Sequence, residues 1–333
     1  MLKTDPVPLE PVRILCAADA AYAASLCVML VSLLINHAKN RKIEIYVLAS
    51  EIPEDDRRKI ETSLRANRLD FELSSLHWLS PSRDIVQGLP VSDHINLEAY
   101  SRLLAPLVLP QDVTRVLYLD SDMVILSDLS TLYDSPQDDC AIHATRDIDV
   151  GTVCAKKGVF NFADLGIPPK TPYFNSGVLL INLRHWREEN VMERILQYLK
   201  HNKDSVHYHD QGGMNAILHD SWAEIDLTWN QTRSILWPEQ WRILGYSSAD
   251  WRRVKNHPKI VHYTTPDKPW LPHMRRPGYS YFFKYLDKTS YRTAFKGKLL
   301  ENIIGFRLYF FLWSVTRRFT PKQQEPVNLA TSS

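Results

Sequence analysis

The N-terminal part of the chain alternates apolar runs of strand length with longer helical segments. The runs VRILCAAD and IEIYVLAS, at residues 12–19 and 43–50, have the character of buried strands, and DFELSSL, at 70–76, predicts a third strand. Residues 21–38 are apolar almost throughout, as in a buried helix, and residues 53–69 begin with proline and acidic side chains, as helices often do. This β-α-β-α-β order predicts an α/β fold, a parallel sheet with helices on its faces.

The rest of the chain contains further strand and helix signals around one loop. Residues 77–96 are rich in proline, glycine, serine and aspartate and are expected to form that loop. The apolar patterns predict strands at residues 115–125, 140–147, 174–183, 221–229 and 259–265. They predict helices at residues 96–110, 187–201 and 210–218. Length alone allows one large domain or two small ones.

Composition and charge are those of an ordinary globular protein. Of 333 residues, 44% are hydrophobic and 23% charged, and the net charge of +2 gives no sign of nucleic-acid binding. The basic excess lies entirely in the C-terminal tail, from residue 291 onward. Four cysteines without a CxxC pair indicate reduced thiols in the cytosol. We expect neither a signal peptide nor a membrane-spanning helix, because no apolar stretch is long enough.

Asp120 and Asp122 interrupt the apolar run RVLYLDSDMVI at residues 115–125. The strand before them is apolar enough to be buried on both faces, and ligands bind at the carboxyl ends of such strands. Residues two apart in an extended chain point to the same side, where two carboxylates repel unless a cation lies between them. Carboxylate oxygens suit Mg²⁺ or Mn²⁺, whose other ligand is commonly a phosphate. The pair is therefore a candidate metal site for a phosphorylated substrate; alternatively, the aspartates only cap the turn after the strand.

Six segments in a fixed order give the chain a wider resemblance. They are AAD at residues 17–19, AYSRL at 99–103, LYLDSDMVI at 117–125, YFNSGVLLINLRHW at 173–186, HDQGGMNAI at 209–217 and VHYTTPDKPW at 261–270. Together they resemble glycosyltransferase family 8 over about residues 12–275, and within it the bacterial lipooligosaccharide and lipopolysaccharide galactosyl- and glucosyltransferases. The resemblance implies the GT-A fold, a Rossmann-like mixed sheet flanked by helices that binds a nucleotide sugar. It also implies metal-dependent transfer with retention of configuration.

The resemblance assigns roles to residues that match the family's motifs. It implies that Asp120, Asp122 and His262 bind Mn²⁺, or Mg²⁺ in its place, and imidazole is a suitable third ligand. The implied donor- and nucleotide-binding residues are Ala17, Asp19, Tyr22, Arg102, Ser121, Asn175, Thr265 and Lys268.

Within the donor set, the roles divide among base, sugar and diphosphate. Asp19 matches the residue that reads the uracil, and Tyr22 matches an aromatic residue that stacks on the base. Arg102 and Lys268 match residues that contact the donor sugar and the diphosphate, and Asn175 matches a ligand of the sugar. The glycine of the FNSG motif is expected to allow a close approach of the backbone.

The remaining matches concern catalysis and the acceptor. Asp210 and Gln211 match the pair nearest the anomeric carbon, although Asp210 could also simply cap a helix. His94 and Asp147 align with acceptor-side residues. The amide of Gln211 is a poor nucleophile, so we expect front-face attack in which an oxygen of the leaving phosphate accepts the proton of the acceptor.

The chain departs from the family pattern in the donor site. Ala20 and Ala21 stand where the family often has Asp or Asn, and Thr265 stands where it has glycine. A contact to uridine or ribose can therefore be lost or taken over by the backbone, and the diphosphate pocket can be tighter. The metal ligands are unaffected, so the departures bear on the identity of the donor and not on the chemistry.

The C-terminal tail has a pattern of its own. Residues 303–315 are nearly all apolar, with Arg307 as the one charge, and are too few to span about 30 Å of hydrocarbon. Lys296, Arg307, Ser314 and Arg318 fall on one helical stripe. The pattern predicts a helix that lies on an anionic membrane surface. The alternative is a helix docked on the catalytic domain.

These observations predict a leader at residues 1–11, a GT-A domain at 12–275 and a helical membrane-association tail at 276–333. The predicted protein is a cytoplasmic enzyme at the inner face of the membrane that moves galactose or glucose from a UDP-sugar to a glycan or glycolipid. One alternative is a nucleotide-sugar-binding or membrane-adaptor protein with a decayed site. Another is a metal-dependent phosphatase, which we would expect to carry DxD on its first strand, where this chain has a single Asp19.

Overall fold

The computed structural model describes the chain between residues 9 and 295 with several gaps. The described residues are 9–38, 40–49, 51–67, 74–80, 100–136, 139–236, 242, 244–264, 266–271 and 278–295. The predictions for His94, for Thr265 and for the helix of the tail lie outside these residues. Among the helices within them, none is both long enough and apolar enough to cross a membrane.

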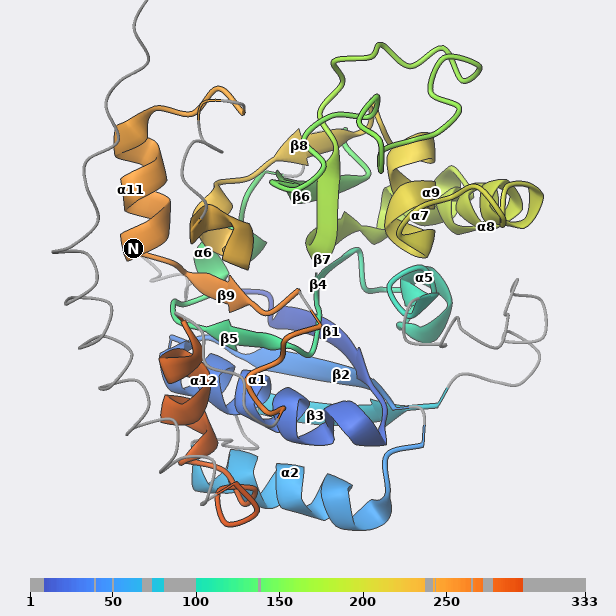
Figure 1. The fold of residues 1–333 in the computed structure, drawn as a ribbon. Coiled ribbons are helices and arrows are strands. Elements are labelled where there is room, and N and C mark those ends of the chain that lie inside the picture. Colours follow the sequence, from blue (N-terminus) through green and yellow to red (C-terminus); the bar gives the residue numbers. More distant parts are fainter. Residues whose placement is uncertain are drawn as a thin grey trace, which may run out of the picture.

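A seven-stranded sheet forms the centre of the molecule, in the order β3-β2-β1-β4-β7-β6-β8 (Figure 1). Its strands are β1 Val12–Ala18, β2 Ile43–Ala49, β3 Ser74–Leu79, β4 Arg115–Leu119, β6 Ile142–Arg146, β7 Phe174–Asn182 and β8 Trp222–Glu224. The first four strands of the chain, β1 to β4, pair in parallel. This half of the sheet confirms the prediction from the strand–helix alternation.

Strand β7 runs opposite to both of its neighbours, β4 and β6, so the complete sheet is mixed. The parallel sheet predicted from the alternation is therefore confirmed for β1 to β4 only, and the mixed sheet implied by the resemblance is confirmed for the whole. The apolar pattern of a doubly buried strand does not carry its direction. Direction is decided by the pairing of β7 with β4, which runs from Arg115 opposite Asn182 to Leu119 opposite Val178.

Apolar clusters cover both faces of the sheet, and β4 contributes to each. The α-helices are α1 Ala23–Asn36, α2 Glu54–Ala66, α5 Ala105–Val108, α6 Ser130–Tyr133, α7 Leu183–Glu188, α8 Val191–His201, α9 His209–Ile217, α11 Ser248–Asn256 and α12 Tyr279–Leu286. The 3-10 helices are η1 Ala20–Tyr22, η2 Leu227–Asn230 and η3 Arg233–Leu236. Val116 and Tyr118 pack with side chains of α7, α8 and α9, while Leu117 and Leu119 pack with those of α1. In Figure 1, α1, α2 and α12 accordingly lie apart from α5, α7, α8 and α9.

The run RVLYLDSDMVI is not one strand, as the sequence predicted. After β4 the chain bends, and β5 Met123–Ile125 pairs with β9 Ile260–His262 in a second, two-stranded sheet. Polar side chains of α1 hold β5 in place. The N–H of Ile125 donates to Oγ of Ser32 at 2.8 Å, and Nδ2 of Asn36 donates to the carbonyl oxygen of Ile125 at 3.0 Å. A buried helix that offers these partners satisfies a strand edge that would otherwise be unpaired.

Three further predictions differ in their bounds. The described part of the helix expected at residues 96–110 contains only α5, because Pro106 fits the first turn of a helix better than its interior. The helix expected at 187–201 is two helices, separated at Asn190, whose φ of 48° is left-handed. The strand expected at 221–229 is only β8, because η2 begins soon afterwards.

Candidate active site

The carboxyl end of β4 leads into a bend at residues 120–122 that is tied to both sheets. The N–H of Asp120 donates to the carbonyl oxygen of Gly177 on β7, and the N–H of Tyr263 donates to the carbonyl oxygen of Asp122, each at 3.0 Å. The two aspartates therefore converge because the chain bends, and not through the side-chain alternation of an extended strand.

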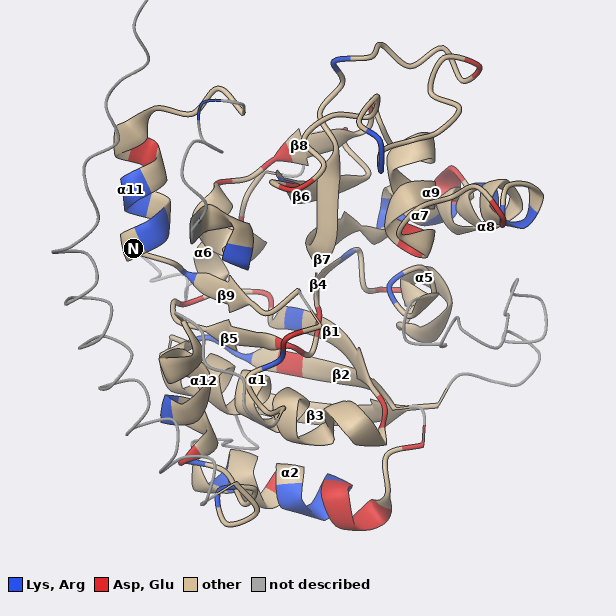
Figure 2. Cartoon of the chain, in the orientation of Figure 1, with Lys and Arg blue, Asp and Glu red and all other residues tan. Residues whose placement is uncertain are grey.

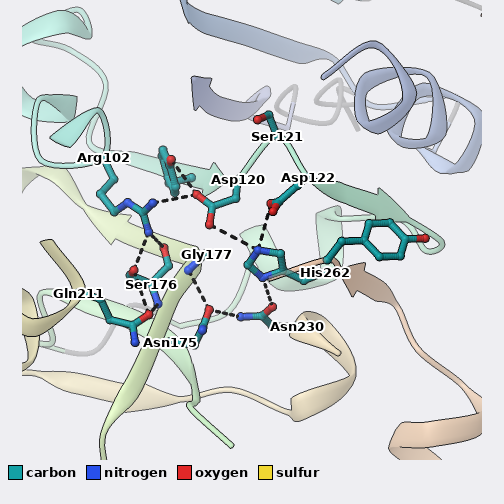
Figure 3. Close-up of polar contacts among 12 residues, drawn as sticks. Arg102, Asp120, Ser121, Asp122, Asn175, Ser176, Gly177, Gln211, Asn230 and His262 are labelled. Atoms are coloured by element: carbon teal, nitrogen blue, oxygen red, sulfur yellow. Dashed lines mark hydrogen bonds and ion pairs between the residues drawn. The ribbon is translucent and has the colours of Figure 1, made fainter. Parts of the chain in front are cut away.

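Asp120, Asp122 and His262 meet at this bend (Figure 3). The Nε2 atom of His262 lies 3.5 Å from Oδ2 of Asp120 and 3.1 Å from Oδ1 of Asp122. One potential ligand atom from each residue lies within 4.8 Å of the others. Among the His, Cys, Asp and Glu side chains of the described residues, these three lie close enough together to share a metal ion.

Gly177 on β7 lies directly against this group, as Figure 3 shows. A Cβ atom at this position would lie 2.3 Å from Cε1 of His262 and 2.9 Å from Oδ2 of Asp120. Both distances are shorter than van der Waals contact, so no side chain larger than hydrogen fits. The predicted close approach of the backbone at the FNSG glycine is confirmed.

Arg102 is buried at the site and connects two of its carboxylates. Its guanidinium lies 2.9 Å from Oδ1 of Asp120 and 3.0 Å from Oδ2 of Asp210. It also donates to the carbonyl oxygen of Ser176 at 2.6 Å, and it stacks over the Tyr118 ring at 4.7 Å from the centroid. These contacts hold Arg102 inside the protein and orient Asp120 and Asp210 relative to each other.

Two buried carboxyls of the site have opposite pKa shifts. Burial raises the pKa of the Asp210 carboxyl to about 6, against the opposing effect of Arg102. For Asp122, burial acts in the same direction, but His262 and Lys268 outweigh it and hold its pKa below the ordinary value. Asp122 is therefore ionised at neutral pH, and Asp210 titrates closer to neutrality.

The residues present fit a divalent cation. Three carboxylates face two permanent cations, so added positive charge is favoured; they are Asp120, Asp122 and Asp210 against Arg102 and Lys268. Two carboxylates and an imidazole are also ligands that Mn²⁺ accepts, and the two carboxylates suit Mg²⁺.

The residues matched to the nucleotide lie next to the metal group. The side chain of Asp19 caps η1 by accepting from the N–H of Tyr22 at 3.0 Å. Tyr22 meets the Trp270 ring edge-on, with the ring centroids 5.5 Å apart. The Nζ atom of Lys268 lies 5.9 Å from the Tyr22 centroid and 2.5 Å from Oδ2 of Asp122. Lys268 therefore bridges the aromatic pair and the aspartates.

Two other residues of the predicted donor set are buried in the scaffold. Ala17 lies on β1 near its carboxyl end. Ser121 lies in the bend, where its carbonyl oxygen accepts a hydrogen bond from Oγ of Ser25 at 2.9 Å.

The residues matched to the sugar, to catalysis and to the acceptor form one hydrogen-bonded group. Nδ2 of Asn175 and Nε2 of Gln211 both donate to Oδ2 of Asp147 at 3.1 Å. Oε1 of Gln211 accepts from the N–H of Ser176 at 3.0 Å. The structure thus brings together the predicted catalytic, metal and sugar residues that it describes, whereas Ala17 belongs to neither group.

Comparison with known proteins identifies the family. The sequence model of Glycosyl transferase family 8 matches residues 13–273 of the 333. The chain belongs to glycosyltransferase family 8. The family indicated by the six sequence segments is thereby confirmed.

Relatives of this family 8 glycosyltransferase cover most of its length. General stress protein A of Bacillus subtilis (strain 168) is 28% identical over 287 residues, which are 85% of this chain and 96% of that protein. The lipopolysaccharide 1,2-glucosyltransferase of Escherichia coli (strain K12) is 24% identical over 285 residues, 85% of this chain and 80% of that protein. The crystal structure of the galactosyltransferase LgtC in complex with donor and acceptor sugar analogues matches with a TM-score of 0.68 and 25% identity, over 84% of this chain and 96% of that one. The expected GT-A fold is confirmed.

Family 8 membership and the topology both argue against the phosphatase alternative. The paired aspartates follow β4, which lies fourth in the order β3-β2-β1-β4 and pairs with β7. They do not follow the first strand of the chain, where we would expect the DxD motif of a metal-dependent phosphatase.

The polar residues of the family 8 site that were not predicted from the sequence include Ser176 and Asn230. Ser176 accepts from Arg102 and donates to Gln211, and it could have been chosen as part of the FNSG motif. Asn230, at the end of η2, is 1% exposed and contacts His262. No local pattern singles out Asn230, because its role depends on residues that are distant in the sequence.

A cleft of about 900 Å³ opens over the site. Beyond the residues already described, it is lined by Asp149, Lys156, Lys157, Tyr208, His209 and Arg233. Tyr208 and His209 have φ angles of 56° and 44°, in the left-handed region that side chains other than glycine seldom adopt. This strained turn begins α9 and directs Asp210 and Gln211 into the cleft.

Proposed function

We propose that this chain is a retaining glycosyltransferase that moves galactose or glucose from a UDP-sugar to a glycan or glycolipid acceptor. The convergence of Asp120, Asp122 and His262 beside Lys268 carries the proposal. Mn²⁺ is the metal that this ligand set favours, with Mg²⁺ as the alternative. The cleft volume of about 900 Å³ is sufficient for a nucleotide sugar with part of an acceptor.

The donor would extend from the Tyr22 side of the site toward Asn175. Asp19 and Tyr22 are assigned to the base, and Lys268 to the diphosphate, since a compact ammonium is a suitable phosphate partner. Arg102 is assigned to the donor sugar and the diphosphate. It also orients the carboxylates that face the donor, because its guanidinium contacts Asp120, Asp210 and Ser176.

The transfer would proceed at the front face of the sugar. A bound divalent metal would act as a Lewis acid toward the departing diphosphate. Gln211 is held at both ends of its amide, by the N–H of Ser176 and by Asp147, which leaves it no free nucleophilic atom. We therefore assign Gln211 and Asp210 to electrostatic stabilisation of the developing sugar cation. The acceptor hydroxyl would attack from the side of the leaving phosphate and pass its proton to a phosphate oxygen.

The acceptor and the location of the enzyme are part of the same proposal. The names of the Escherichia coli glucosyltransferase and of LgtC support hexose transfer to a saccharide acceptor. His94 and Asp147 are assigned to the acceptor side. The apolar, basic tail would place the enzyme at the cytoplasmic face of the membrane, beside a lipid-linked acceptor.

The donor site is tested by isothermal titration with UDP, UDP-galactose and UDP-glucose, with and without Mn²⁺. Wild type is compared with Asp122→Ala and with Asp220→Ala, which removes an exposed carboxylate in the turn after α9. We expect metal-dependent UDP binding that Asp122→Ala abolishes and Asp220→Ala preserves. Absence of UDP binding under every metal condition would refute the UDP-sugar donor. Binding without turnover, even with water as acceptor, would favour a decayed site.

A further inference from the structure

Asn230 lies between the metal group and the catalytic group. Its Nδ2 donates to Oδ1 of Asn175 at 2.8 Å, and its Oδ1 lies 2.9 Å from Nδ1 of His262 (Figure 3). Asn230 is 1% exposed and lies on a 3-10 helix outside every sequence motif. Burying a polar side chain costs free energy unless it is hydrogen-bonded, and the direction of each hydrogen bond around Asn230 indicates its role.

The orientation of the Asn175 amide is fixed by groups that cannot exchange donor and acceptor. The backbone N–H of Gly177 donates to Oδ1 of Asn175 at 3.0 Å, so this atom is an oxygen. Nδ2 of Asn175 faces Oδ2 of Asp147 at 3.1 Å. Asp147 is held in turn, because its Oδ1 accepts from the backbone N–H groups of Asp149 and Val150 at 2.9 and 3.0 Å.

The fixed amide of Asn175 determines the orientation of the next two side chains. Because Oδ1 of Asn175 only accepts, Asn230 must turn its NH₂ toward it and its oxygen toward His262. The Nδ1 atom of His262 must then carry a proton. Its Nε2, directed at Asp120 and Asp122, is then the ring nitrogen that can offer a lone pair to a cation, and without a cation it can instead donate a proton to those carboxylates.

We propose that Asn230 is a positioning residue that fixes the tautomer of His262, so that Nε2 is the atom presented to a divalent cation. The proposal rests on the metal dependence put forward above and adds a residue to it. Partners of this kind behind a metal-binding histidine commonly account for 10–100-fold in affinity. The same Asp147 also anchors Gln211, so one carboxylate orients both the histidine and the catalytic amide.

Mn²⁺ titration of the full-length, metal-free protein tests the proposal. Asn230→Leu and the smaller Asn230→Ala both remove the acceptor for Nδ1, and each should weaken Mn²⁺ binding about 10–100-fold. Asn230→Asp keeps the acceptor for Nδ1 but loses the donor to Oδ1 of Asn175, so it should weaken Mn²⁺ binding less than Asn230→Leu and Asn230→Ala. Asn182→Leu is the matched control, since it removes an N-cap of α7 without contact to His262. Wild-type affinity in both Asn230→Leu and Asn230→Ala would overturn the proposal.

Nitrogen-15 NMR of histidine-labelled, metal-free protein gives a readout that does not depend on metal binding. The His262 signal is assigned by its loss in His262→Gln. We expect the neutral ring to carry its proton on Nδ1 in wild type and Asn230→Asp, and to populate the other tautomer in Asn230→Ala. A neutral ring in wild type that carries its proton on Nε2 and not on Nδ1 would refute the proposal. If wild type shows the Nδ1 proton but binds neither Mn²⁺ nor Mg²⁺, the orienting role holds and the metal-dependent function fails.

Discussion

At the scale of single residues, the site depends on Gly177, which has no side chain. Gly177→Ala would place a Cβ 2.3 Å from Cε1 of His262 and 2.9 Å from Oδ2 of Asp120. We expect Mn²⁺ affinity to fall by at least about tenfold, because one metal ligand must move. Gly166→Ala is the control: its φ of 70° makes alanine costly, by about 1 kcal/mol, but nothing lies within 4 Å of the added atom. Equal Mn²⁺ affinity in Gly177→Ala and wild type would contradict this view, and calorimetric titration decides it.

Asp210 predicts a pH dependence of stability. Its pKa is about 6 in the folded protein, above an unfolded value of about 3.9. Between these values the folded state binds more protons, so the free energy of unfolding decreases as pH rises. In metal-free buffer, wild type should therefore lose about 2–3 kcal/mol relative to Asp210→Asn between pH 4 and 7.

The measurement for Asp210 is urea unfolding of both proteins across that pH range. Comparison with Asp210→Asn removes the contribution of the other carboxyls that titrate in both proteins. Parallel stability profiles would show that Asp210 has an ordinary pKa in the folded state. They would also remove the case for a carboxyl that titrates close to neutral pH.

At the scale of elements, η2 matters because it carries Asn230 to the site. Asp226 caps this helix by accepting from the N–H of Thr228 at 2.9 Å, and it pairs with Arg253 of α11 at 2.7 Å. Asp226→Ala should lower the free energy of unfolding by about 1–2 kcal/mol, mostly through the lost cap. Arg253→Ala should cost at most about 1 kcal/mol, because that side chain is 48% exposed.

Chemical denaturation of the Asp226 and Arg253 variants separates the cap from the ion pair. In the cartoon of Figure 2, α11 is coloured blue at its Lys and Arg positions. The side chains of Arg253 and Asp226 are 48% and 38% exposed, so solvent screens the pair. A larger loss for Arg253→Ala than for Asp226→Ala would mean that the ion pair holds η2 and that the cap is secondary.

At the scale of the whole molecule, the site occupies the line where the parallel half of the sheet meets the antiparallel strand β7. Ligands of open α/β sheets bind at the carboxyl ends of parallel strands, and β4 supplies that end here. Because β7 runs the other way, its N-terminal FNSG segment lies at the same edge. The mixed sheet thereby brings Asn175 to Gly177 against the aspartates.

The proposed membrane association concerns the whole chain and is tested by truncation. Deleting residues 296–333 should release the enzyme from anionic vesicles, while UDP binding is retained. The truncation keeps Tyr291. Its hydroxyl donates a hydrogen bond to Oδ1 of Asp56 on α2 at 2.9 Å. Vesicle flotation at low and high salt provides the measurement. Unchanged flotation of the truncated protein would show that the tail is not the anchor.

From the amino-acid sequence we could predict the parallel half of the fold, the family, and most of the residues that meet at the site. These follow from local information: apolar runs between helices, and short motifs in which neighbours along the chain act together. Asp120 and Asp122 are such neighbours, and so are Asp210 and Gln211. Polar residues at the end of a buried strand are conspicuous without any knowledge of what lies opposite them.

How these parts face one another could be learned only from the folded chain. The break between β4 and β5 depends on Ser32 and Asn36, and the direction of β7 depends on its partner strands. The role of Asn230 depends on backbone donors more than fifty residues away. Strand direction and amide orientation are settled by hydrogen bonds between distant segments once they are buried, and a local pattern carries no record of those partners.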